Sequence, residues 1–306
     1  MTERLYTILN RDAFEWLPLR PPESVEAVVT DPPYGIVEYS DDQLAKRKNG
    51  KGIWRLPQAY DGYKRTSMPR FTVLQDSDRA RIQAFHQELA PLLGRVLVPG
   101  GHVFLASHNL FTHLVINAFV AAGFELRGQV ARIVKTLRGG DRPKGAHVQY
   151  PEVCVSPRSC WEPWLIFRKP CDGRVRDNLE RWGTGALKRP HRDVPFPDLI
   201  VSSTVRGLER TIANHPSVKP QAFMRQIVAA TLPLERGTVL DPFMGSGATV
   251  AAATALGIRS VGLEINREYY ALARRAIPKL SGLVIDDPYL NYVTKPLRFR
   301  KTSASG

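Results

Sequence analysis

The sequence predicts an α/β fold, in which a mostly parallel sheet is covered by helices on both faces. Three observations support this prediction: short apolar runs alternate with stretches of helical composition, turns rich in Gly and Pro separate them, and acidic residues follow several of the runs. The 306 residues are 43% hydrophobic and 24% charged, which is close to globular averages and excludes wholesale disorder. The chain has room for one large domain with a sizeable insertion.

The clearest unit lies near the C-terminus. Residues 238–240 form a short apolar run that predicts a buried strand, and Asp241-Pro-Phe-Met-Gly-Ser-Gly247 after it predicts a tight glycine turn. The Ala-rich residues 248–256 predict a helix that ends at Gly257. Strand, glycine turn and helix in this order are typical of nucleotide-binding sheets, although the turn is not a GxGxxG motif and a plain turn has the same composition.

A second strand is expected over residues 260–264, and Asn266 is expected to cap a helix over residues 267–279. Glu264 ends this strand 17 positions after Gly247. Dinucleotide-binding folds place an acid at about this spacing to hold ribose hydroxyls. The two units together therefore predict one half of a doubly wound sheet.

The N-terminal half repeats the alternation. Residues 25–29 predict a strand that ends at Asp31-Pro-Pro-Tyr34-Gly, because two prolines cannot continue a central strand. Further along we expect a turn at 99–101, a strand over 102–107, a helix over 110–122 closed by Gly123, and strands over 124–134 and 161–167 that pair as a hairpin.

The chain is strongly basic: 43 Lys and Arg against 29 Asp and Glu give a net charge of +14. Such a charge favours an anionic partner, and nucleic acid is the leading candidate. Two long stretches, residues 36–70 and 171–213, are expected to be irregular, basic and in contact with DNA. The residues expected to contact DNA are Lys46, Arg47, Lys48, Lys51, Arg55, Arg174, Arg176, Arg181, Lys188 and Arg189.

Several classes are disfavoured by composition. No apolar run approaches the roughly 20 residues that cross a bilayer, and the N-terminus lacks the pattern of a secretory signal. The three cysteines show no CxxC spacing, which argues against a disulfide framework and a zinc site and suits a reducing cytoplasm. The histidines show no metal-ligand spacing either, so no metal is expected.

The loop Asp31-Pro-Pro-Tyr34 suits a particular chemistry, although proline turns with a leading Asp are also common. An exocyclic base amine is a poor nucleophile because its lone pair is delocalised into the ring. The Asp31 carboxylate and a rigidly held proline carbonyl can each accept one N–H, which favours a tetrahedral, attacking nitrogen. Tyr34 can stack on a base that has rotated out of the duplex.

Three segments resemble motifs of the S-adenosylmethionine-dependent DNA amino-methyltransferases. Asp31-Pro-Pro-Tyr34 is similar to their catalytic signature, and residues 241–247 are similar to their S-adenosylmethionine loop. His215-Pro-Ser-Val-Lys-Pro220 resembles the segment before that loop in the circularly permuted β group, whose catalytic motif comes first. The resemblance covers about residues 5–280 and includes two weaker motifs, Asn10-Arg-Asp12-Ala and Trp161-Glu-Pro-Trp164.

The resemblance implies a Rossmann-like sheet with a small irregular target-recognition insertion, S-adenosyl-L-methionine as cofactor and double-stranded DNA as partner. It implies that Asp31, Pro32, Pro33 and Tyr34 hold the target base and its amine. The cofactor residues that it implies are Asp12 on the adenine side, Lys219 at the carboxylate, Asp241 at the amino end, Phe243, Gly245, Ser246 and Gly247 around the methionine, and Glu264 at the ribose.

The same resemblance implies a catalytic domain over residues 1–286, followed by a basic tail over 287–306. It also implies cytoplasmic action on DNA, a cognate restriction endonuclease as a functional partner, and a homodimer. The methylated atom stays open at this point: Asp at the first signature position slightly favours N6 of adenine over N4 of cytosine.

Other functions fit the residues less well. An RNA or protein amino-methyltransferase usually has Asn where Asp31 stands, and a non-catalytic DNA-binding relative would not need an intact signature. A cytosine C5 enzyme needs a thiolate, but Cys171 lies in an irregular basic stretch away from the signature. A NAD-dependent dehydrogenase would carry GxGxxG near the N-terminus.

Overall fold

The computed structural model describes residues 5–33, 75–138, 148–154, 156–157, 159–202, 207–214 and 218–285. It also gives the backbone of two short antiparallel strands, β3 (Trp54–Arg55) and β4 (Met68–Pro69). Several expectations fall outside the described residues: those for Tyr34, for Lys46, Arg47, Lys48 and Lys51, for the side chain of Arg55 and for the whole tail over 287–306.

A sheet of eight strands forms the centre of the molecule, in the order β1-β10-β9-β2-β5-β7-β6-β8. Within this sheet β7 runs antiparallel to its two neighbours, and the other pairs are parallel. The strands are β1 (Tyr6–Leu9), β2 (Val25–Thr30), β5 (Leu97–Ala106), β6 (Glu125–Arg138), β7 (Ser159–Arg168), β8 (Leu199–Ser202), β9 (Thr238–Asp241) and β10 (Arg259–Leu263).

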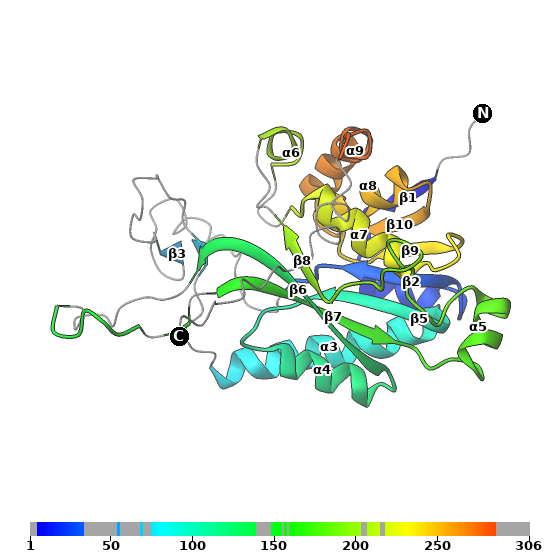
Figure 1. Ribbon diagram of the computed structural model, residues 1–306, viewed down its shortest axis with the longest axis horizontal. Helices are drawn as coiled ribbons and strands as arrows, with labels where there is room; N and C mark the ends of the chain where they lie inside the picture. Colours follow the sequence, from blue (N-terminus) through cyan, green and yellow to red (C-terminus); the bar gives the residue numbers. More distant parts are fainter. Residues whose placement is uncertain are drawn as a thin grey trace, which may run out of the picture.

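Helices cover both faces of this sheet, as the sequence predicted (Figure 1). One face packs against α1 (Ala13–Trp16), the 3-10 helix η1 (Leu17–Leu19), α3 (Asp76–Val96) and α4 (Thr112–Ala121). The other face packs against α7 (Gln221–Thr231), α8 (Ala248–Ala255) and α9 (Arg267–Ser281), with the short α6 (Gly207–Ile212) beside α9.

Strand β2 shows why this arrangement is stable. All but one of its residues are buried, and successive side chains point to opposite faces: Val28 packs in the α3 and α4 core, whereas Ala27 and Val29 pack in the α7 and α8 core. A strand that is apolar on both faces belongs at the centre of a parallel sheet covered on both sides. The parallel strands β2, β9 and β10 end at one edge of the sheet, which we call the carboxyl edge.

The local predictions for the C-terminal unit are confirmed. Helix α8 follows the glycine turn and ends before Gly257, which has a φ of +72°. Asn266 caps α9, because its side chain accepts from the backbone N–H of Glu268 and Tyr269. The strands expected over 124–134 and 161–167 are β6 and β7, which pair antiparallel.

The expectation of a turn at residues 99–101 is wrong. These residues lie inside β5, where the pairing with β2 shifts between Val25 and Ala27, so that β5 absorbs extra residues as a bulge. Gly100 makes this bulge possible: its φ is +76°, and a Cβ there would lie 2.3 Å from Asn178 Nδ2. The sequence Pro99-Gly-Gly101 correctly indicated an irregular backbone, but the strand β5 continues through this irregularity.

The expectation of an irregular stretch over residues 171–213 is also wrong in part. This stretch contains α5 (Val175–Trp182), the sheet strand β8 and α6. Strand β8 pairs in parallel with β6 and is the outermost strand on that side of the sheet. Helix α5 ends at Gly183 with a φ of +76°, and its run of charged residues concealed it in the sequence.

Candidate active site

Three acids lie at neighbouring strand ends on the carboxyl edge. Asp31 follows β2, Asp241 is the last residue of β9, and Glu264 follows β10. Strand β9 lies between the other two strands, so their carboxyl ends adjoin. Open α/β sheets bind ligands at this edge. The residues that the sequence singled out near positions 31 and 241 are therefore brought together although about 200 residues separate them.

Asp241 is almost fully buried, with 3% of its surface exposed. Its Oδ1 accepts from Thr30 Oγ1 at 2.8 Å and from the backbone N–H of Phe243 at 3.2 Å. Burial raises the pKa of Asp241 to about 7, while hydrogen bonds from Thr249, Thr30 and Phe243 lower it and the charge of Asp31 raises it further. This carboxyl is therefore held in place on three sides and is reluctant to ionise.

The loop after β9 turns sharply into α8. Gly245 and Gly247 both have positive φ, of +52° and +86°. The backbone N–H of Gly247 donates to Met244 O at 2.8 Å, which closes the turn. A Cβ on Gly247 would lie 2.5 Å from Ile277 Cγ1 of α9, so only glycine fits between the loop and this helix.

Glu264 is fixed by the same loop. Its Oε2 accepts from the backbone N–H of Gly245 at 2.9 Å, and its Oε1 accepts from that of Asn266 at 2.8 Å. Burial raises the pKa of Glu264, whereas the two backbone hydrogen bonds lower it. Asn10 reinforces the strand end by donating to Glu264 O at 2.7 Å. The carboxylate is thus oriented by rigid backbone groups before any ligand binds.

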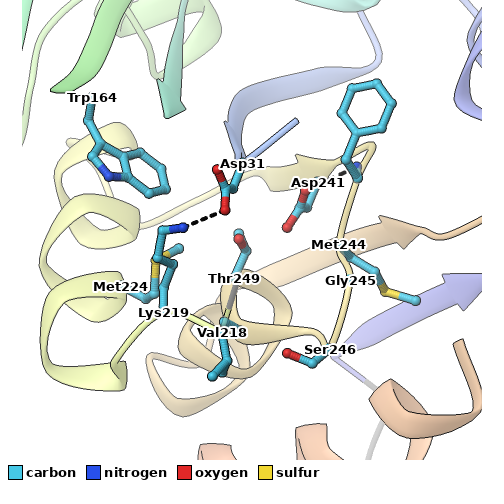
Figure 2. A pocket seen from close by; sticks show the side chains of 12 residues that line it. Asp31, Trp164, Val218, Lys219, Met224, Asp241, Met244, Gly245, Ser246 and Thr249 are labelled. Atoms are coloured by element: carbon cyan, nitrogen blue, oxygen red, sulfur yellow. Dashed lines mark hydrogen bonds and ion pairs between the residues drawn. The ribbon is translucent and has the colours of Figure 1, made fainter. Parts of the chain in front are cut away.

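A pocket opens between these elements (Figure 2). Asp31, Asp241 and Gly245 line it from the sheet side, and Lys219, just before α7, and Met224 of α7 also line it. Its remaining lining residues are Trp164, Val218, Phe243, Met244, Ser246, Ala248 and Thr249. The catalytic and cofactor segments expected from the sequence therefore share one cavity.

Phe243 connects this pocket with the opposite face of the sheet. Its ring centroid lies 5.6 Å from that of Phe85 on α3 and 6.3 Å from that of Phe14 on α1. Asp12 lies nearby at the carboxyl end of β1, where its Oδ1 caps α1 by accepting from the Phe14 N–H at 2.8 Å. Asp12 thus has a structural role as the cap of α1, and its expected place on the adenine side of the cofactor stays a prediction.

Lys219 contacts residues that the sequence did not connect with it. Its Nζ lies 2.5 Å from Asp31 Oδ2 and 3.2 Å from Glu162 Oε1 (the Asp31 contact is the dashed line at the left of Figure 2). Burial alone would lower the pKa of Lys219, but the charges of Asp31 and Glu162 outweigh it and the pKa is raised. The expected contact with a cofactor carboxylate stays a prediction.

Sequence reasoning missed Glu162, Thr30 and Thr249 as members of the site. Glu162 lies within Trp161-Glu-Pro-Trp164, a segment already singled out by its resemblance, which was the available signal. Trp164 of the same segment is fully buried and lines the pocket. The two threonines carry no motif, and only the fold brings them to Asp241.

The basic residues of the 171–189 stretch lie far from this pocket. Helix α5 packs on the beginning of β5, where Asn178 Nδ2 donates to Pro99 O at 3.0 Å. Because β5 runs parallel to β2, its beginning lies at the end of the sheet opposite to the carboxyl edge, where Asp31 lies. Most of these side chains are also in ion pairs. The pairs are Arg174 with Asp177, Arg176 with Glu180, Arg181 with Asp172 and Lys188 with Glu235, while Arg189 donates to Arg192 O.

Within the described ranges, no group of three or more His, Cys, Asp or Glu side chains is placed to hold a metal ion. Over the same ranges, every helix is too short or too polar to cross a membrane. Directly after Asp31, Pro32 is buried and Pro33 is exposed.

The residues that line the pocket, and Glu264 beside its glycine loop, fit S-adenosylmethionine. Each oxygen of Glu264 accepts one backbone N–H and has a second lone pair that suits a ribose hydroxyl. Trp164 Nε1 is a buried donor without an acceptor among the described residues, and its side chain lines the cavity. Such a donor is expected to be satisfied by a ligand or by water. The glycine loop allows close approach of a ligand to its backbone.

Comparison with known proteins agrees with this geometry. A family model described as DNA methylase, of the N6/N4 type, matches residues 25–275. The type II methyltransferase M2.DpnII of Streptococcus pneumoniae is 21% identical over 276 residues, covering 88% of each chain. M.HindIII of Haemophilus influenzae is 25% identical over 300 residues, covering 87% of this chain and 93% of its own. The crystal structure of the M1.HpyAVI–SAM complex superposes with a TM-score of 0.53 at 17% identity, covering 88% and 98% of the two chains.

The chain thus shares its Rossmann-like fold with a protein that was solved in complex with S-adenosylmethionine. The family match extends this conclusion, because it spans most of the chain and includes both Asp31 and the glycine loop. The chain belongs to the N6/N4 DNA methylase family. It is a site-specific DNA methyltransferase that modifies an amino nitrogen, either N6 of adenine or N4 of cytosine.

Proposed function

We propose that Asp31 and the carbonyl of Pro32 hold the exocyclic amine of a base that has rotated out of duplex DNA, and that the base is adenine. The supporting observation is that Asp31 lines the same pocket as Asp241 and the glycine loop. S-adenosylmethionine supplies an electrophilic methyl group. Alignment of the amine with that group contributes much of the rate, and Asp31 contributes by accepting one N–H.

The remaining chemistry follows from the positions of the side chains. Asp31 lies at the end of a stiff strand and is followed by two prolines, so its carboxylate is oriented before the base arrives. Glu264 and Gly245 hold the nucleoside end of the cofactor, and Asp241, Phe243 and Ser246 surround its methionine end. Tyr34, which lies outside the described residues, stacks on the base. The choice of adenine rests on Asp at the first position of the signature.

We propose that the duplex contacts the carboxyl edge and that Lys46, Arg47, Lys48, Lys51 and Arg55 bind its phosphates. The arginines of α5 are proposed to stabilise the fold instead, because they lie at the opposite edge and are paired with acids. We assign target recognition to the part of residues 171–213 that follows β8, since β8 ends at Ser202 beside Val134 of β6.

The biological setting is proposed from the relatives. Both curated relatives carry names of type II methyltransferases, which favours a cognate restriction endonuclease as functional partner in the same cytoplasm. A homodimer is proposed on family resemblance alone, and light scattering of the purified protein would measure it.

One experiment tests the function directly. The purified protein is incubated with isotope-labelled S-adenosylmethionine and mixed-sequence duplex DNA, and the nucleosides are identified by mass spectrometry. Label on N6-methyladenine is expected; label on N4-methylcytosine would keep the reaction class and correct the base. Label on 5-methylcytosine would overturn the mechanism. The variant Asp31→Ala is expected to bind the cofactor but to lose turnover, and near-native turnover would contradict the role of Asp31.

A further inference from the structure

The Asp31 carboxylate belongs to a buried chain of alternating charges that reaches three further strands. Lys219 Nζ lies between Asp31 Oδ2 at 2.5 Å and Glu162 Oε1 at 3.2 Å. Glu162 Oε2 in turn lies 2.5 Å from Arg132 NH1 on β6. Arg132 Nε donates to Ser202 Oγ at the end of β8, at 3.1 Å. The side chains of the four charged residues are only 6–19% exposed.

This chain of charges is not explained by the stability of the β6–β7 pair. Burying charges is costly, and replacing a buried ion pair with apolar residues is often neutral or stabilising. The same two strands carry a second cross-strand pair, in which Arg168 NH2 lies 2.6 Å from Glu125 Oε2 at the opposite edge of the sheet. There the Glu125 side chain is 38% exposed, so the hairpin does not require its ion pairs to be buried.

The pair at the carboxyl edge differs because its glutamate also contacts Lys219. A lysine ammonium is a compact charge on a flexible stem, and it moves towards whichever carboxylate attracts it more. Glu162 supplies a second carboxylate on the side away from β2, and Arg132 fixes Glu162 in turn. The guanidinium of Arg132 is itself held over the ring of Phe223, with Cζ 5.1 Å from the ring centroid.

We infer that Glu162 is a positioning residue for methyl transfer: it shares Lys219 with Asp31, and thereby orients the Asp31 carboxylate and keeps it available as an acceptor for the amine. Arg132 is the second member of this arrangement, because it orients Glu162. The inference rests on the proposed role of Asp31. Glu162 is assigned no contact with substrate or cofactor, so its loss acts through Lys219.

The test compares Glu162→Gln with Glu125→Gln, a matched control that removes the glutamate of the other cross-strand pair. We expect Glu162→Gln to lower kcat 10-fold or more, with KM for DNA and Kd for S-adenosylmethionine within 2-fold of wild type. Glu125→Gln is expected to keep wild-type kcat. Glu162→Asp retains the charge on a shorter side chain and is expected to recover part of the lost kcat.

A double variant controls for the case in which Glu162→Gln lowers kcat only because the protein no longer folds. Glu162→Gln leaves Arg132 buried beside a neutral amide, whereas the double variant Glu162→Gln/Arg132→Gln removes both charges of the pair. We expect the double variant to fold and still to show the low kcat, because Lys219 has lost its second carboxylate. Wild-type kcat in the double variant would overturn the inference.

The outcomes separate this inference from the proposed function. If the wild-type protein does not methylate DNA, the proposed function fails first. If the wild type is active and Glu162→Gln matches Glu125→Gln in kcat, only the positioning role fails. A rise in KM or Kd as large as the fall in kcat would also overturn it, since Glu162 would then act in binding.

Discussion

Lys219 Nζ and Asp31 Oδ2 lie 2.5 Å apart although 188 positions separate them in the chain. This contact joins the segment before α7 to the loop after β2, so Lys219 and Asp31 connect the two sides of the pocket. The raised pKa of Lys219 keeps it protonated, and its pairing stabilises the fold below the unfolded value of 10.5. That stabilisation is lost only as the pH rises through the higher folded value.

The variant Lys219→Met is expected to lower both stability and activity. It leaves the carboxylates of Asp31 and Glu162 buried without their shared cation, and breaking a buried pair in this way costs about 3–5 kcal/mol. Urea unfolding measures this loss, and kcat is expected to fall at least 100-fold. The control Lys188→Met removes a pair with the exposed Glu235 and is expected to change little. Wild-type stability of Lys219→Met would show that the cation is not needed.

Glu264→Gln is expected to weaken cofactor binding. Both carboxylate oxygens accept backbone N–H groups, from Gly245 and Asn266, whereas a Gln amide presents only one acceptor and turns an NH₂ towards one of these donors. We expect Kd for S-adenosylmethionine, measured by calorimetry, to rise 10- to 100-fold. Glu268→Gln, on the exposed first turn of α9, serves as the control. Equal affinities of the two variants would remove Glu264 from the cofactor site.

Two glycines with similar backbone angles allow a test of the loop. Gly247 and Gly257 have φ of +86° and +72°, but a Cβ on Gly257 meets nothing within 4 Å, whereas one on Gly247 meets Ile277 at 2.5 Å. Gly257→Ala is expected to cost about 1–2 kcal/mol from the left-handed backbone alone. Gly247→Ala is expected to cost clearly more in urea unfolding and to impair cofactor binding. If the two variants lost the same unfolding free energy, α9 would have to move aside at little cost.

The sequence predicted those parts of the fold whose signals are local. The unit from Thr238 to α9 was correct within about two residues at each boundary, because a glycine turn and the Asn266 cap mark its limits. Helix α3 was missed: it is polar in composition and contains Pro91 inside its 21 residues. The strand β8 was missed because it is only four residues long within a basic stretch.

The candidate site also has a part that local patterns predict and a part that only the fold creates. The sequence predicted the strand-end positions of Asp31, Asp241 and Glu264, because each follows a short apolar run. The contacts of Lys219 with Glu162, and of Thr30 with Asp241, join residues that are distant in the chain. No local sequence pattern predicts such contacts, since they depend on the order of the strands in the sheet. For the α5 arginines, charge alone does not say at which end of the sheet a residue lies, and their contact with DNA stays a prediction to be tested.

Neutralising the α5 arginines is therefore expected to leave DNA binding unchanged. The triple variant Arg174→Gln/Arg176→Gln/Arg181→Gln removes three charges at the edge opposite Asp31. Its KM for DNA should stay within 2-fold of wild type at every salt concentration. Neutralising Lys46, Arg47 and Lys48 is expected to weaken binding and to reduce the slope of log K against log salt by about 0.9 for each DNA phosphate that is no longer neutralised. A reduced slope in the α5 variant would place DNA at that edge.

Asp241 should give the unfolding free energy a distinctive dependence on pH. Its pKa is about 7 in the folded protein, against an ordinary value of 3.8. Between these values the folded state holds the proton more tightly than the unfolded state, so the contribution of Asp241 to stability falls as the pH rises from about 4 to about 7. His102 acts in the opposite direction, because burial lowers its pKa from 6.5 to about 3, with the charges of Arg168 and Arg127 adding to the effect.

The wild-type pH profile is the sum of these opposing contributions, so a variant is needed to separate them. Asp241→Asn removes one titration and leaves that of His102 in place. The difference in unfolding free energy, wild type minus variant, is expected to fall by about 1.4 kcal/mol per pH unit between pH 4 and 7 and to level off above. Urea unfolding at intervals across this range measures it. A flat difference would mean that Asp241 titrates near its ordinary value, and that its burial beside Thr30 and Thr249 is compensated by those hydrogen bonds.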